Sequence, residues 1–480
     1  MLKLASGGTG EGRKWGRVLE LDRVSQGPSQ TRGVVGWAVG FGCSVLADQV
    51  FFLALAWAAV QVGAPGLVGL VLAAGSVPRI LVLLVGGAIA DTRSPKRIII
   101  GTDSGRALVL AVAATLLFLG NLDAWGLVAI AVVVGTLDGF FLPAVAALPV
   151  RIAPPHLMGR VSALRTITQR VGMLGGGPLA GWLIYLFGPN AAFAGSAVLF
   201  GLSVAALALV TVPPTAPSAA DPPLEESRHP SAAGRRPLWA KVITGAWQDI
   251  GNGFQIVRRS PVLAGLLLLI GGMNVGFSGP FTAGIPLLAA AHGWGARGAG
   301  LLVGAFGVGA AVSGLGLLVI RRVPRAGWVQ LVAVLSMGVA LGMIGSAATL
   351  LAALAAGVVL GLASGVFGTV VYALLLQTTP KAQVGRVMAL LSLTLEGSAA
   401  LSFLVTGGLA TAVGAGTTFL LGGLVIVATA LTASTPRIRR LQMDRTEPEP
   451  KAGADAELDA DSWSVRDEST ARPVPVEPPR

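Results

Sequence analysis

The feature that most constrains this chain is a succession of twelve apolar runs, each about as long as a lipid bilayer is thick. A membrane-spanning helix needs ~20 predominantly apolar residues. Because the bilayer core offers no water to backbone groups, each run is expected to form a helix. The runs lie at about residues 34–60, 66–90, 98–119, 125–149, 165–187, 190–212, 262–289, 298–320, 327–347, 350–376, 387–411 and 416–434. The sequence predicts an all-α membrane protein with twelve transmembrane helices.

Composition excludes other classes of protein. Only 12% of the 480 residues are charged and 53% are hydrophobic, whereas soluble domains carry roughly 25% charged residues. The net charge of +12 is expected to gather on one side of a membrane rather than to bind nucleic acid. One cysteine, Cys43, and three scattered histidines give no metal-ligand spacing, and no Gly-x-x-x-x-Gly-Lys-[Ser/Thr] motif occurs. We therefore predict no enzyme activity, no catalytic residues, no metal and no cofactor.

Basic residues are concentrated in the loops on one side of the predicted bundle. With the N-terminus inside, the outer loops carry essentially only Arg297. Basic loops stay in the cytoplasm, so both termini are expected there. An excess of arginine over lysine is typical of high-GC bacteria, which favours a bacterial inner or plasma membrane. The inner loops carry Arg93, Lys96, Arg97, Arg151, Arg160, Arg235, Arg236, Lys241, Arg258, Arg259, Arg321, Arg322, Arg325, Lys381, Arg386, Arg437, Arg439 and Arg440.

The chain contains a tandem repeat. The segment Pro154 to Leu164, with its Gly-Arg-Val core, returns later in the chain as Pro380 to Leu390. Six predicted helices separate the copies, so they share one orientation, as in a parallel repeat of two six-helix halves. The expected division is an N-terminal cytoplasmic tail (1–33), a first half (34–212), a cytoplasmic linker (213–260), a second half (261–436) and a disordered acidic tail (437–480).

Within the linker, apolar residues recur at helical spacing, which predicts an amphipathic helix. Two placements remain open: on the inner leaflet, or packed beneath the bundle. The apolar positions are Trp239, Ile243, Trp247, Ile250, Phe254 and Val257.

Several motifs resemble the major facilitator superfamily. Gly87 to Arg97 resembles its inner-loop signature, with Thr92 departing from the usual basic residue. Ala47-Asp48-Gln49, Val77-Pro78-Arg79 and Phe141-Leu142-Pro143-Ala144 resemble the bacterial branch that includes the enterobactin exporter and macrolide efflux proteins. The resemblance covers roughly residues 34 to 434. Gly177 to Gly181 partly resembles the signature of drug-proton antiporters, although a close-packing kink explains it equally. The resemblance implies two six-helix halves that alternate access to a central site.

Charged residues deep in the apolar runs mark the candidate site. A charge in hydrocarbon is costly unless it is paired, hydrated or neutralised. The apolar runs contain four carboxylates but only two arginines, unless the side chain of Arg165 or Arg170 also extends into the bundle. The residues are Asp48, Asp103, Asp138 and Glu396, and Arg79 and Arg106. We expect at least one carboxylate to exchange protons: Asp48, with Arg79 as its partner, or else Asp138 or Glu396. A structural ion pair, a helix-helix hydrogen bond or a hydrated cavity are the alternatives. Asp103 and Arg106, one turn apart, are expected to form a structural ion pair.

The resemblance also implies a cytoplasmic gate. Asp91 is expected to approach the start of the eleventh helix near Gly385, and Arg151 on the fourth. A carboxylate at a helix N-terminus is favoured by roughly 0.3–1 kcal/mol. A solvated loop that only sets topology is the alternative. The candidate gate residues are Asp91, Arg97, Arg151, Arg160 and Arg386.

Together these features predict a proton-coupled exporter, an antiporter of small amphiphilic organic molecules such as drugs, antibiotics or siderophores. Its expected partners are the substrate, protons and the lipid bilayer, and we expect a monomer. Two alternatives remain: an importer or facilitator of a small nutrient on the same fold, and a non-transporting membrane receptor or lipid-handling protein.

Overall fold

The computed structural model describes residues 28–92, 94–153, 158–210, 251, 253–319, 322–323, 325–380, 383–433 and 443–444. Most of the predicted tails and of the linker therefore lies outside the described residues, including four of the six apolar positions of the amphipathic helix. The end of that helix is described: residues 253–259 are helical, with Val257 buried and Phe254 exposed. A Cβ at Gly253 would lie 3.1 Å from the backbone oxygen of Arg386, so this turn packs beneath the second half.

The predicted all-α fold is confirmed, because nearly every described residue lies in a long helix. The first half contains α2 (Pro28–Val62), α3 (Pro65–Thr92), α4 (Pro95–Phe118), α5 (Ala124–Ile152), α6 (Met158–Phe187) and α7 (Pro189–Ala208). In the second half, α9 (Pro261–Gly279) continues through a π-helical turn, η2 (Pro280–Gly284), into α10 (Ile285–Ala291). The remaining helices are α11 (Gly295–Val319), α12 (Ala326–Gly345), α13 (Leu350–Thr378), α14 (Val384–Val413) and α15 (Ala415–Ala433).

Eleven helical stretches of the described chain are long and apolar enough to cross a membrane, with α9, η2 and α10 forming one of them. The twelfth long helix, α6, is less apolar because it carries Arg165, Arg170 and the glycine run 175–177. It packs against α2 and, across the molecule, against α11. Its polar character fits a helix that lies between the two halves rather than one surrounded by lipid.

Proline and glycine set the helix boundaries. Pro95, Pro189 and Pro261 occupy the first turn of α4, α7 and α9, where a missing N–H costs nothing. Gly188 and Gly414 adopt φ of +85° in the α6–α7 and α14–α15 connections, a conformation that only glycine takes without strain. These breaks lie at corresponding points of the two repeats, since the spacing from Gly188 to Gly414 equals that from Pro154 to Pro380.

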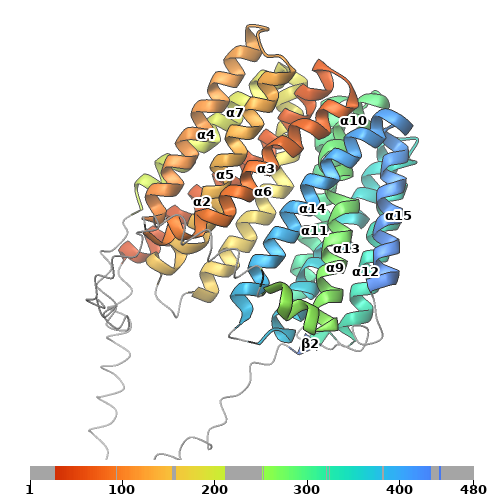
Figure 1. Cartoon of the computed structure of the whole chain (residues 1–480). Helices are drawn as coiled ribbons and strands as arrows, with labels where there is room; N and C mark the ends of the chain where they lie inside the picture. The colour runs from red at the N-terminus through yellow and green to blue at the C-terminus, as the bar shows by residue number, and fades with distance from the viewer. Residues whose placement is uncertain are drawn as a thin grey trace, which may run out of the picture.

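Figure 1 shows the two halves as neighbouring bundles, red to yellow for α2–α7 and green to blue for α9–α15. Two helix pairs make most of the contact between them: α3 with α14, and α6 with α11. A two-residue strand pair, β1 (Arg322–Val323) with β2 (Met443–Asp444), adds to the second half near the end of α11. The bundle is thus two six-helix units joined along two crossings.

Glycines bring the halves together at both crossings. A Cβ at Gly181 of α6 would lie 2.9 Å from the Cα of Gly300 on α11, and a Cβ at Gly69 of α3 would lie 2.9 Å from the Cα of Gly407 on α14. Gly181 and Gly407 occupy equivalent positions in the two repeats. Such contacts allow the backbones to touch. Both crossings lie at the helix ends opposite the basic loops, so the halves are closed together at that end.

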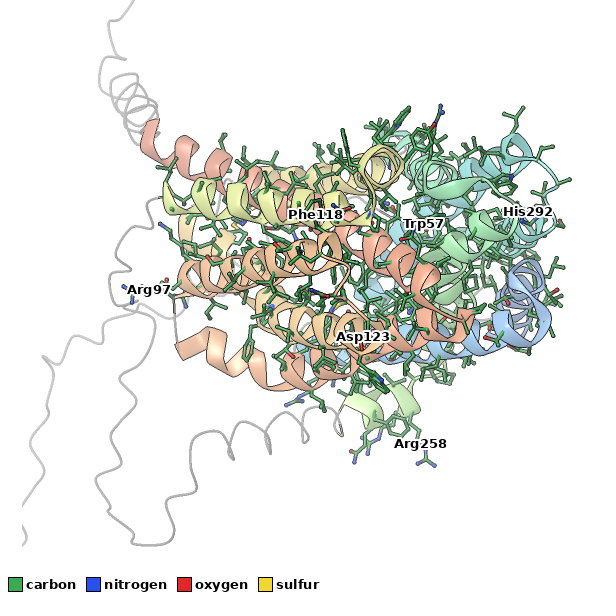
Figure 2. All side chains as sticks on the ribbon, turned by 90° about the horizontal axis from the view of Figure 1, so that it is seen from above. Trp57, Arg97, Phe118, Asp123, Arg258 and His292 are labelled. Atoms are coloured by element: carbon green, nitrogen blue, oxygen red, sulfur yellow. The ribbon has the colours of Figure 1, made fainter. Side chains whose placement is uncertain are left out.

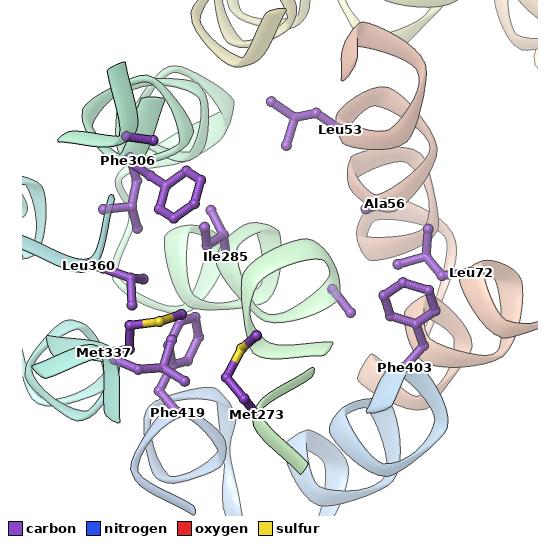
Figure 3. Close-up of a cluster of buried hydrophobic side chains, with 14 of the residues drawn as sticks. Leu53, Ala56, Leu72, Met273, Ile285, Phe306, Met337, Leu360, Phe403 and Phe419 are labelled. Atoms are coloured by element: carbon purple, nitrogen blue, oxygen red, sulfur yellow. The ribbon is translucent and has the colours of Figure 1, made fainter. Parts of the chain in front are cut away.

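Apolar side chains fill the space behind these crossings. In the second half, Met273, Met337 and Phe419 cluster, and Phe403 of α14 faces Leu72 of α3 across the two halves (Figure 3). Figure 2 shows Arg97 and Arg258 projecting away from the bundle. Charge is therefore largely confined to the surface, and the few charged groups inside stand out.

Leucine at the glycine crossings should separate the halves. We expect Gly407→Leu and Gly181→Leu to lengthen the distance between spin labels at Val62 and Val413, which end helices of opposite halves, in a Cys43→Ser background. Double electron-electron resonance spectroscopy measures the distance between the two labels. The control is Gly201→Leu, because a Cβ at Gly201 meets no atom within 4 Å. An unchanged distance in both crossing variants would show that these glycines do not hold the halves together.

Candidate functional site

The centre of the first half is organised around the guanidinium of Arg106 on α4, which is fully buried. Asp103 lies one helical turn earlier, and its Oδ1 is 2.8 Å from Nη2. Asp138 of α5 and Asp48 of α2 both approach Nη1, at 2.9 Å and 3.1 Å. One arginine therefore pairs with three carboxylates that come from three helices.

Aromatic rings complete the surroundings of Arg106. Its guanidinium carbon lies 4.2 Å from the ring centre of Phe141 and 4.7 Å from that of Phe200. Ring faces attract cations most strongly where water is excluded. The Nη1 and Nη2 groups of the arginine thus face carboxylates, and its guanidinium also lies near two aromatic rings.

Asp103 is the most completely bound of the three carboxylates. The hydroxyls of Ser44 on α2 and Ser203 on α7 lie 2.6 Å and 2.7 Å from its Oδ2 and can donate to it, while Arg106 meets its other oxygen. The side chains of Asp103 and Arg106 are both fully buried. The predicted Asp103–Arg106 ion pair is present, as part of a larger cluster than the sequence indicates.

Asp48 and Asp138 share a single guanidinium nitrogen, so neither has an exclusive cationic partner. The Asp48 side chain is 23% exposed and the Asp138 side chain 7%. Two carboxylates on one nitrogen repel each other unless one of them carries a proton. Asp48 is the better exposed of the two to protons from outside the cluster.

A second ion pair joins the two halves. Nη2 of Arg79 on α3 lies 3.4 Å from Oε1 of Glu396 on α14, and the two side chains are 24% and 21% exposed. We expected Arg79 to partner Asp48; the structure instead pairs Asp48 with Arg106 and Arg79 with Glu396. The reason is position, since Arg79 lies along the α3–α14 crossing. Within the described residues, these carboxylates have no ion pair to Arg165 or Arg170.

A cavity of about 410 Å³ lies between the halves, and both members of the Arg79–Glu396 pair line it. Five phenylalanines dominate its wall: Phe52, Phe277, Phe281, Phe306 and Phe403. The polar lining comes from Gln49, Ser76, Asn274, Ser278, Thr282 and Ser364. The volume is in the range of small-molecule sites, roughly 300–1,000 Å³.

A small void of about 20 Å³ connects this cavity to the Arg106 cluster. Arg79, Ser76 and Phe52 line both spaces, and Asp138 lines the void. About 10–15 Å³ is enough for one water molecule. The void therefore has room for one water molecule beside Asp138, Arg79 and Ser76.

The wall formed by the second half is mainly aromatic, and Glu396 is its charged residue. The rings of Phe281 and Phe306 lie 4.5 Å apart and those of Phe277 and Phe281 5.0 Å apart. The π-helical turn η2 contains Phe281, and such turns often occur at functional sites. On the preceding turn, Nδ2 of Asn274 donates to the Leu395 oxygen at 2.8 Å. This wall offers a ligand the surfaces of several aromatic rings.

Sequence reasoning missed Asn274 and the phenylalanines. The repeat contained the signal: aligning its two copies places Asn274 at the position of Asp48, and Ser364 at the position of Asp138. The uncharged counterparts of the two aspartates line the cavity. The phenylalanines gave no signal, because a ring in an apolar run normally faces lipid or core.

The predicted gate is only partly described. Arg97, Arg151 and Arg386 are exposed, whereas the side chains of Asp91 and Arg160 lie outside the described part of the chain. A Cβ at Gly385, at the start of α14, would meet no described atom within 4 Å, while the turn at Gly253 packs against the backbone oxygen of the neighbouring Arg386. The gate remains a prediction.

Comparisons with known proteins agree with this architecture. Residues 37–353 match the Major Facilitator Superfamily. Similar solved structures include a mutant of the nucleoside transporter NupG, 11% identical with TM-score 0.65, covering 84% of this chain and 98% of that one. A bacterial homolog of the human lysosomal transporter Spinster is 13% identical with TM-score 0.63, covering 86% and 96%.

A third similar structure is a D-xylose-proton symporter, 16% identical with TM-score 0.60, covering 85% of this chain and 98% of the symporter. None of the curated proteins compared with the chain matches it. At these identities the solved structures show a common fold and nothing about cargo.

Removing the two arginines should have unequal effects on stability. Arg106→Gln leaves three buried carboxylates without a cation, and breaking a buried pair costs about 3–5 kcal/mol. Arg79→Gln should cost much less, because Glu396 is part of a cavity wall. Thermal unfolding of the detergent-solubilised protein measures the difference, with surface Arg297→Gln as the control. Equal losses for Arg79→Gln and Arg106→Gln would contradict the central role of Arg106.

Proposed function

The chain belongs to the Major Facilitator Superfamily, and on that premise we propose that it is a proton-coupled exporter of small amphiphilic organic molecules. It works as an antiporter in a bacterial cell membrane, with both termini in the cytoplasm. Drugs, antibiotics and siderophores are the candidate cargo. The likeness of Ala47-Asp48-Gln49 and Val77-Pro78-Arg79 to the enterobactin-exporter and macrolide-efflux branch supports this class of cargo.

The observation that carries the proposal is the excess of carboxylates inside the bundle. Within the part of the chain that the structure describes, Asp48, Asp103, Asp138 and Glu396 form ion pairs only with Arg79 and Arg106. If all six were ionised, the interior would hold two uncompensated negative charges, which a low-dielectric medium disfavours strongly. Protons that enter and leave supply the compensation, and in a transporter their movement is available for coupling.

Asp48 and Asp138 are the first proton site in this scheme. A proton on either carboxylate relieves their repulsion at the shared Nη1 of Arg106. The void beside Asp138 gives that proton a route to the substrate cavity. Asp103, bound by two serines and the arginine, holds Arg106 in place.

The Arg79–Glu396 pair is the second proton site and the point of coupling. This pair joins the halves, so protonating Glu396 releases Arg79 and weakens the attraction between α3 and α14. Substrate and proton then bias the same movement, in which the halves rock about a central site. The cavity is accessible from one side at a time.

The cavity suits an amphiphilic cargo. Its phenylalanines offer ring faces, and Gln49 and Asn274 offer amide groups that can orient a ligand through hydrogen bonds. Few polar groups on a largely apolar wall are typical of sites for drug-sized molecules. The charged pair in the wall lets a bound molecule affect the ion pair directly.

Vesicle transport tests the function. Purified protein is reconstituted into lipid vesicles that contain a pH-sensitive dye. A pH gradient is imposed across the vesicle membrane, and a panel of fluorescent aromatic dyes and antibiotics is added outside. Antiport predicts that uptake of a substrate releases protons in the opposite direction. Proton movement in the same direction as the substrate would identify an importer instead, and a protein that moves none of the panel would favour a receptor or lipid-handling role.

Neutralising Asp48 should uncouple transport. Asp48→Asn removes the exchangeable proton and keeps the size of the side chain, so gradient-driven transport should fall at least tenfold while counterflow without a gradient persists. Asp123→Asn is the matched control, since Asp123 caps α5 at the surface and asparagine caps equally well. Undiminished gradient-driven transport in Asp48→Asn would remove Asp48 from the mechanism.

Neutralising Asp91 should shift the conformational balance. If Asp91 holds the inner side shut by contacting the start of α14, Asp91→Asn should slow transport and favour the form that is open to the cytoplasm. Reactivity of a cysteine at Gly385 (Gly385→Cys, in Cys43→Ser), where an added Cβ meets no atom within 4 Å, toward a polar maleimide reports the opening. Unchanged transport and unchanged labelling would refute the gate.

A further inference from the structure

We propose that a groove on the membrane-facing side of the second half binds one anionic phospholipid. The phosphate lies at Arg325 and one acyl chain runs along α12. The groove has a volume of about 710 Å³. Its lining comes from α11, from the start of α12 and from α13: Ser313, Gly316, Arg325, Trp328, Val329, Val332, Ala333, Ser336, Val359, Leu362, Ala363 and Val366. It shares no lining residue with the substrate cavity.

Packing explains why the groove exists. Both α11 and α12 pack closely against α13, and small residues, Gly316, Ala333 and Ala363, line the space between them. A further hollow of about 310 Å³ shares Val332, Ser336 and Val359 with the groove and continues it to Met343. The groove and this hollow together form one elongated apolar depression along α12, called the channel below.

The apolar lining of this channel is open to the surroundings. Val332 is 58% exposed and Val359 46% exposed. In a helix that faces the bilayer, the natural contact for such residues is an acyl chain. A channel rather than a flat surface lets one chain be held on three sides, which increases its dispersion contacts.

One end of the channel carries a basic residue, Arg325. Arg325 lines it directly, and the connection before α12 reads Arg321-Arg322-Val323-Pro324-Arg325. Asp444 is the backbone partner of Arg322 in the β1–β2 pairing, which sets one acidic residue against three arginines in sequence. Arginine binds phosphate through charge-assisted, often bidentate hydrogen bonds. The positive charge of Arg325 favours an anionic headgroup over a zwitterionic one.

Trp328 marks the same end as the membrane interface. It lines the channel one turn after Arg325, and tryptophan is enriched at headgroup depth. From Arg325 to Ser336 the helix rises ~16 Å, about half of the roughly 30 Å hydrocarbon core. A headgroup at Arg325 therefore extends its acyl chain along the groove to the middle of the bilayer.

The two faces of α13 connect this site to the substrate cavity. Ala363 lines the groove, and the next residue, Ser364, lines the cavity. A lipid in the groove thus supports the helix whose other face forms the substrate wall. The lipid site does not depend on the proposed transport reaction.

Native mass spectrometry of the full-length protein tests the proposal. The protein in detergent is titrated with palmitoyl-oleoyl phosphatidylglycerol or with phosphatidylcholine of the same chains. We expect one tightly bound phosphatidylglycerol per chain and about tenfold weaker binding in Arg325→Gln, the loss expected for one charged hydrogen bond. Arg297→Gln, at the opposite end of α11, is the control for charge and should bind as the unaltered protein does.

A second variant fills the groove. Ser336→Phe should abolish the tight adduct, whereas Leu351→Phe, at an exposed position of α13 outside the groove, should retain it. Equal affinity for the two lipids, or undiminished binding in both Arg325→Gln and Ser336→Phe, would overturn the proposal. So would a dimer that Ser336→Phe dissociates, because the groove would then hold a second copy of the chain.

Discussion

The interior of the first half depends on one electrostatic constraint, that a single buried guanidinium has to satisfy three carboxylates. Arg106 does so because α2, α4 and α5 each bring one aspartate to it. Serines of α2 and α7 satisfy the oxygen of Asp103 that Arg106 does not face. Four helices therefore converge on one charge, and this convergence places Asp48 and Asp138 in competition for the same nitrogen.

The two halves carry different kinds of polar side chain, although they are two copies of one sequence repeat. Asp48 and Asp138 in the first half correspond to Asn274 and Ser364 in the second, which are uncharged and line the cavity. Titratable groups are thus concentrated in one bundle, and hydrogen-bonding amides and aromatic rings in the other. The Arg79–Glu396 pair is the electrostatic connection between them, so a change on either side of the cavity reaches the other half.

Close approach of glycines makes this connection geometrically possible. Where Gly181 meets Gly300 and Gly69 meets Gly407, the halves touch along their backbones, and the cavity opens beyond these contacts toward the basic ends. The crossings need no large side chain and no charge, so the halves can separate there without exposing unsatisfied polar groups. A contact of this kind is suited to forming and breaking repeatedly.

The sequence by itself determined the class of protein, the number of long helices and the repeat. Length and apolarity of each run decide whether a segment crosses a bilayer, and these are local properties. It also identified Asp48, Asp103, Arg106, Asp138 and Glu396 as charges that a bilayer does not tolerate without a reason. Only the tertiary structure decided the partners. Which arginine meets which carboxylate, and which rings face the cavity, depends on how helices rotate and cross, and hydropathy carries no record of that rotation.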